Sequence, residues 1–181
     1  GVAKPSRHNQ PDIKGLHEKI VTLHEGKNPT VLPGISDMTI LKLSGELGCD
    51  YTKWPSEKHF TSWMGLSPIK HQSGKTNKNK RRKVNSKAGQ IFKESAMSIA
   101  NSKYLSLKGF YYRIKSKHGA KAAIKATARK LAVLYYRYMT QGIDYVEIGL
   151  SEYEKRYKEQ AIQALTRKAK YLGYQLVSNA N

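Results

Sequence analysis

The chain has 181 residues and carries 33 Lys and Arg against 13 Asp and Glu, a formal net charge of +20. Its lone cysteine, Cys49, excludes an internal disulfide framework and a zinc site built from several cysteines. No apolar run in the sequence approaches the roughly 20 residues that a membrane-spanning helix needs. A hydrophobic content of 39% is enough for one domain with a buried core.

The apolar spacing and the turn residues predict a mostly α-helical chain. A first helix is expected within residues 11–26, and residues 1–30 are interpreted as a helical lead-in. Ser36 is expected to cap a second helix that ends at Gly48, and a short third helix is expected within residues 55–65.

Residues 66–85 have no regular apolar period and are rich in Gly, Asn, Ser and cations. This composition predicts a long basic loop or a small hairpin. Ser86 is expected to cap the helix that follows.

Two further helical patterns, 106–118 and 120–140, meet at Gly119, which predicts a break between them. Together with the preceding elements they define a basic domain over residues 31–143. A last helix, charged on most faces, is expected over residues 151–171, inside an appended C-terminal segment, 144–181.

The positive charge is concentrated in one window of the chain. Residues 58–143 hold 20 Lys and Arg and a single acid, Glu94. Such a concentrated field predicts a polyanionic partner, with nucleic acid the first candidate. An anionic membrane surface usually requires a basic amphipathic helix with a bulky apolar face, whereas this charge is spread over a loop and several helices, so no membrane partner is predicted.

Residues 31–48 have the pattern of the second half of a helix-hairpin-helix element. Gly34 would let the backbone approach a phosphate closely, and the helix that starts at Ser36 would present free N–H groups. Such a contact would not depend on the base sequence. An ordinary helix–helix turn remains the alternative interpretation.

The basic loop and the start of the next helix contain no acid. Neutralising several phosphates there would make binding steeply dependent on salt, although a solvated charge run has the same composition. The predicted phosphate ligands are Lys70, Lys75, Lys78, Arg81, Arg82, Lys83 and Lys87.

Ser73 lies in this loop, directly before Gly74. A serine attacks phosphorus only if its proton is removed, its oxygen is aligned and the developing charge is stabilised. Lys70 and Lys75 could supply the stabilisation, and His71 could accept the proton. Ser-Gly is also common turn chemistry, so the residues alone leave both roles open for Ser73.

The remaining polar groups suggest no second site. His17 and His24 are expected to be surface residues rather than metal ligands. Tyr135 and Tyr136 are expected to pack rather than to act as nucleophiles.

Several stretches, taken together, resemble the C-terminal domain of the insertion-sequence one-ten transposases, the family that includes the Piv DNA invertase. The resemblance covers roughly residues 30–145. It is carried by residues 32–35, 54–68, 73–75, 87–89, 110–113 and 128–132, which follow one another in the order that the family would have them.

The resemblance implies a recombinase that cuts and rejoins DNA through a serine–phosphate intermediate, with Ser73 as its nucleophile. It also implies a structured non-coding RNA as a second partner, a homo-oligomer in the full-length protein, and a nucleoid-associated place in the bacterial cytoplasm.

In the family, magnesium is held by four acidic residues of an N-terminal domain. No such domain and no cofactor are expected in this chain, which is therefore expected to be a fragment that is inactive alone. Two rivals remain: a non-enzymatic helix-hairpin-helix module that binds DNA, and a basic structural protein that binds RNA.

Overall fold

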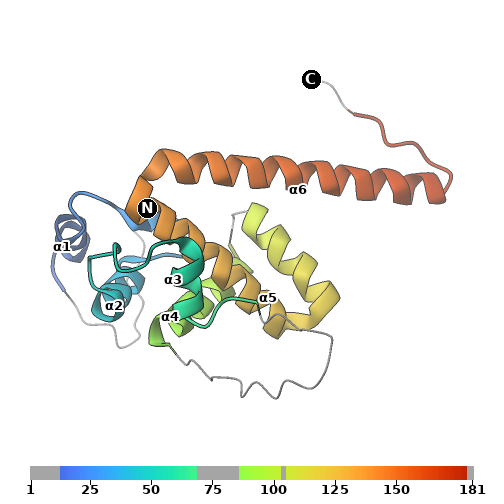
Figure 1. The fold of residues 1–181 in the computed structure, drawn as a ribbon. Helices are drawn as coiled ribbons and strands as arrows, with labels where there is room; N and C mark the ends of the chain where they lie inside the picture. The colour runs from blue at the N-terminus through green and yellow to red at the C-terminus, as the bar shows by residue number, and fades with distance from the viewer. Residues whose placement is uncertain (1–12, 69–85, 103–104, 179–181) are drawn as a thin grey trace, which may run out of the picture.

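The computed structural model describes residues 13–68, 86–102 and 105–178. Within these ranges the chain forms helices and no strand, so the predicted mostly α-helical fold is confirmed (Figure 1). None of the described helices is both long and apolar enough to cross a membrane. The elements are α1 (Leu16–Leu23), the 3₁₀ helix η1 (Pro29–Val31), α2 (Asp37–Leu47), α3 (Glu57–Trp63), α4 (Lys87–Ile99), α5 (Leu105–Gln141) and α6 (Ile143–Tyr171).

Serine N-caps set where three of the helices begin. The side chains of Ser36, Ser56 and Ser86 each accept a hydrogen bond from a backbone N–H in the first turn of α2, α3 and α4. This contact satisfies a donor that the helix itself cannot use, and it typically contributes about 1 kcal/mol. The predicted starts of these helices are therefore confirmed.

The long helix α5 is broken at Gly119, whose φ of 81° and ψ of 169° are not helical. The break divides α5 into a first arm, residues 105–118, and a second arm, residues 120–141, which run in different directions (Figure 1). The predicted break between two helical patterns at this glycine is confirmed.

The last helix starts earlier than the sequence pattern predicts. It begins at Ile143, directly after Gly142 with its φ of 95°, and not near residue 151. With its positive φ, Gly142 lets the chain pass from α5 directly into α6 without a longer connecting stretch. The C-terminal half of α6 extends beyond the other helices (Figure 1).

An aromatic cluster joins α3, α4 and α5 around Phe60, which is completely buried. Its ring lies 4.9 Å from Trp54, 5.2 Å from Tyr136 and 6.4 Å from Phe92, measured between centroids. The hydroxyl of Tyr136 donates to the Trp54 carbonyl oxygen over 2.6 Å. Tyr136 therefore packs in the core, as predicted.

A hydrogen bond of 2.8 Å joins the hydroxyl groups of Tyr51 and Tyr135 inside the same core. Burial raises the pKa of Tyr51 to about 12 and raises the pKa of Tyr135 well above its ordinary value. Both groups therefore remain neutral phenols at physiological pH, and the predicted packing role of Tyr135 is confirmed.

Helices α3 and α4 approach each other closely at Gly89. A Cβ atom at this position would stand against the Met64 carbonyl oxygen, far inside van der Waals contact. Gly89 has an ordinary helical backbone, so it is the space and not the backbone conformation that requires glycine.

We predict that Gly89→Ala lowers the free energy of unfolding by about 1–3 kcal/mol, because α3 and α4 must separate to admit the methyl group. Gly45→Ala is the matched control, since Gly45 lies inside α2 with open space around its Cβ position. That change should raise the stability by roughly 0.5–1 kcal/mol. Urea unfolding measures both, and equal effects of the two substitutions would contradict the packing argument.

His24 is buried, with 3% of its surface exposed, so the prediction of a surface position is wrong for this histidine. Its Nε2 atom lies 2.8 Å from Ser44 Oγ, which itself donates to the Ile40 carbonyl oxygen. The imidazole must therefore donate through Nε2, and no described residue bonds its buried Nδ1 atom. Burial, assisted by the charge of Lys27, lowers the pKa of His24.

We predict that the protein loses stability as the pH falls below about 6.5, because the unfolded chain then binds a proton that His24 in the folded state resists. Thermal melting at about pH 7.5 and about pH 5.5 should show this loss. It should be smaller in His24→Gln, which keeps a donor for Ser44 without titrating. His118→Gln, at an exposed histidine, should leave the pH dependence unchanged; an equal reduction in both variants would contradict this origin.

Candidate nucleic-acid interface

The predicted site residues fall into two groups. Ser73 lies outside the described residues, and so do the predicted phosphate ligands Lys70, Lys75, Lys78, Arg81, Arg82 and Lys83. Gly34, Ser36 and Lys87 lie inside the described part of the chain.

Gly34 has a left-handed backbone, with a φ of 71°, in the connection before α2. A Cβ atom there would lie 2.9 Å from the Ser95 carbonyl oxygen and 3.1 Å from Ile99 Cγ1, both in α4. The connection therefore needs glycine for its turn and for its packing against α4. Its contact with phosphate stays a prediction.

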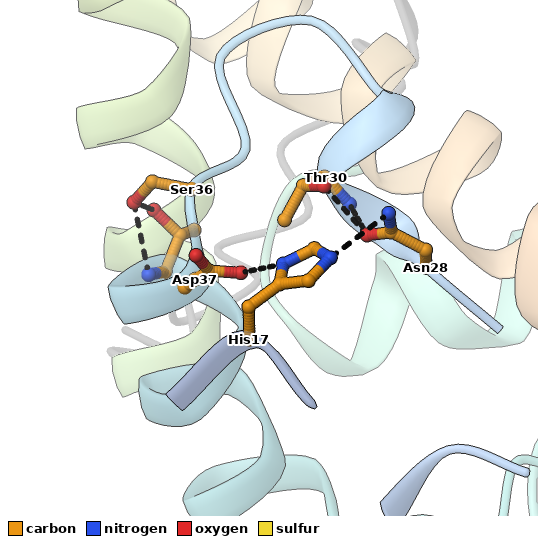
Figure 2. Close-up of polar contacts among 6 residues, drawn as sticks. His17, Asn28, Thr30, Ser36 and Asp37 are labelled. Atoms are coloured by element: carbon orange, nitrogen blue, oxygen red, sulfur yellow. Dashed lines mark hydrogen bonds and ion pairs between the residues drawn. The ribbon is translucent and has the colours of Figure 1, made fainter. Parts of the chain in front are cut away.

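The N-terminus of α2 is already rich in local hydrogen bonds (Figure 2). Ser36 Oγ accepts from the backbone N–H of Thr39, and the carboxylate of Asp37 lies 2.8 Å from His17 Nδ1. The other ring nitrogen of His17 lies 3.5 Å from Asn28 Nδ2. The carboxylate of Asp37 places negative charge where a phosphate would have to bind, while Ser36 itself remains exposed.

Lys87 is the first residue of α4, and its side chain is 83% exposed. Its ammonium lies 3.6 Å from the Glu46 carboxylate, a loose surface pair that contributes little to stability. The Lys87 side chain therefore remains accessible to a phosphate.

The structure reveals a groove between the start of α3, the residues that follow α3 and the two arms of α5, which the sequence did not predict. This α3–α5 groove has a volume of about 610 Å³. Its lining residues are Glu57, Leu66, Pro68, Phe110, Ala122, Lys125, Ala126, Arg129, Lys130, Val133, Leu134 and Arg137. Eight of them lie in the second arm at helical spacing, so one stripe of that arm forms a wall.

The single acid that lines the groove is held by an arginine. Arg137 Nε and Nη2 donate to the two carboxylate oxygens of Glu57 over 2.5 and 2.9 Å. This two-point contact neutralises Glu57 and fixes the second arm of α5 to the first turn of α3. The other charged side chains of the lining are cations.

Two of these cations, Lys130 and Arg129, are partly enclosed by the groove wall. Lys130 places its ammonium 4.4 Å from the centroid of the Phe110 ring, within the distance of a cation–π contact. Arg129 has a buried Nε atom for which no described residue supplies an acceptor. The groove therefore offers desolvated positive charge beside apolar surface.

Magnesium requires several oxygen ligands, usually carboxylates. Within residues 13–68, 86–102 and 105–178 no group of three or more His, Cys, Asp or Glu side chains could hold a metal ion. The described residues therefore do not fit a magnesium site.

Comparison with known proteins identifies the relatives of this region. Residues 30–112 match the model of the IS116/IS110/IS902 transposase family. The chain resembles these transposases. The matched range contains position 73, α2, α3, α4 and the start of α5, and it ends before the second arm of α5. The match supports a function in DNA recombination of the transposase type, which requires binding to DNA.

No curated protein and no solved structure matches the chain significantly.

Proposed function

We propose that this chain is the DNA-binding and nucleophile-bearing domain of a transposase, and that Ser73 forms a covalent bond to DNA. The observation that carries the proposal is the match to the transposase family over residues 30–112, because the matched range includes Ser73 and the basic loop around it. The charge distribution supports the same proposal independently, since residues 58–143 hold 20 cations and one acid.

In the proposed reaction, Ser73 Oγ loses its proton and attacks the scissile phosphorus of DNA. A bond forms between Oγ and phosphorus, the bond from phosphorus to one sugar oxygen breaks, and that oxygen is protonated as it leaves. The phosphate is now joined to DNA on one side and to serine on the other. A hydroxyl of a second DNA end can attack this phosphorus, displace the serine oxygen and complete strand exchange. Nearby cations stabilise the negative charge that develops on the phosphate oxygens.

The covalent chain limits how far Ser73 can be from the α3–α5 groove. Pro68 lines the groove, and Ser73 is the fifth residue after it in the sequence. Five residues span at most about 18 Å, so the DNA that Ser73 attacks passes close to the cations of this groove.

We predict that Ser73→Ala abolishes a covalent protein–DNA adduct. The full-length protein is incubated with Mg²⁺, its RNA and DNA that carries the ends of the element, and the adduct is detected by denaturing electrophoresis. Ser67→Ala, six residues earlier, is the matched control and should leave the adduct intact. An adduct that persists in Ser73→Ala would disprove the role of this serine, and salt-sensitive binding without any adduct would favour a non-enzymatic DNA-binding module.

We also predict that DNA affinity falls steeply with salt, because bound cations displace the counterions of DNA. Replacing Arg81, Arg82 and Lys83 with alanine should reduce the slope of log K against log salt by roughly 3. The control replaces Lys158, Lys168 and Lys170, exposed cations of α6, and should change the slope much less. Fluorescence anisotropy at several salt concentrations measures the slope for both triple variants. An equal reduction of the slope in the two variants would show that the loop has no special role.

A further inference from the structure

The α3–α5 groove has the size and the lining of a site for a small amphipathic ligand. Its volume of about 610 Å³ lies within the range of roughly 300–1,000 Å³ that is typical of ligand pockets. Leu66, Phe110 and Val133 supply apolar surface from three separate segments of the chain. A flat, largely apolar group can lie against this wall and lose its contact with water.

The charge of the groove selects the kind of ligand. Glu57 is occupied by Arg137, so the acid of the lining does not compensate Lys125 and Arg129. The Nε atom of Arg129 is buried without an acceptor among the described residues, and a desolvated donor binds an anion more strongly than an exposed one. An anionic group is therefore expected beside the apolar wall.

We propose that the α3–α5 groove holds a single unstacked nucleotide of the DNA that this chain binds. The base lies against the apolar wall, and its phosphate is bound by Arg129 and Lys125. An arginine fork matches the geometry of phosphate oxygens, and stacking of a base on an aromatic ring such as that of Phe110 is worth about 1–3 kcal/mol. The inference rests on the proposed DNA binding and not on the role of Ser73.

Taking a base out of a duplex costs a few kcal/mol, and the cost is lowest where the base is already unpaired. The groove should therefore favour DNA with an extra, unpaired nucleotide over a perfect duplex. The full chain is titrated with three labelled duplexes of one sequence: perfect, with one extra deoxyadenosine, and with one extra abasic residue. We expect the adenosine bulge to bind at least about 5-fold more tightly than the abasic bulge, the lower end of the contact energy given above.

Two substitutions test whether the groove is responsible. Ala126→Leu fills the groove and should remove the preference for the adenosine bulge over the abasic bulge. Arg129→Ala should weaken binding to both bulged duplexes by similar factors, because each of these duplexes keeps the phosphate. Ala120→Leu and Lys117→Ala, at exposed positions of α5 outside the lining, are the matched controls.

Thermal melting checks that each variant folds. If Ala126→Leu does not fold, Ala122→Leu takes its place in the test, because Ala122 lies one turn earlier on the same stripe of α5. Equal binding of the three duplexes by the natural chain overturns the inference, as does a preference that survives filling of the groove. In both cases binding to the perfect duplex still supports the proposed function. A chain that binds none of the three duplexes overturns both proposals.

Discussion

The packing of aromatic rings around Phe60 holds together the part of the fold on which the candidate interface depends. Phe60 belongs to α3, Phe92 to α4 and Tyr136 to the second arm of α5, and their rings lie within 6.4 Å of Phe60. Three helices that are distant in sequence thereby share one core. Because the α3–α5 groove is formed by two of these helices and the residues that follow α3, its shape depends on this core.

The same core explains why so much positive charge is compatible with a stable fold. The apolar sides of α2, α3, α4 and the second arm of α5 are buried, and the cations lie mainly on the outer faces or along the groove, where water or a polyanion can surround them. The ion pair between Glu57 and Arg137, whose side chains are about one third exposed, crosses from α3 to α5 along this groove. It fixes the two walls of the groove without adding net charge.

The structure also bears on the two interpretations of residues 31–48, a phosphate-binding turn and an ordinary turn between helices. The connection before α2 has the left-handed glycine that a phosphate-binding turn would use, but that glycine faces α4 closely. The positive end of α2 already has Asp37 in its first turn. The groove beside α5, which carries uncompensated cations, is therefore the more favourable place for nucleic acid within the described part of the chain.

Local sequence was enough to predict the helical class, the starts of α2, α3 and α4, and the break at Gly119, because capping serines and glycine turns act through neighbouring residues. It also determined the basic window, since charge can be counted without a fold. The packing of the helices was needed to show that His24 is buried, that Gly89 must be glycine, and that Leu66, Phe110 and Arg129 line one groove. These features depend on contacts between segments far apart in the chain, and no local pattern of residues specifies which segments will meet.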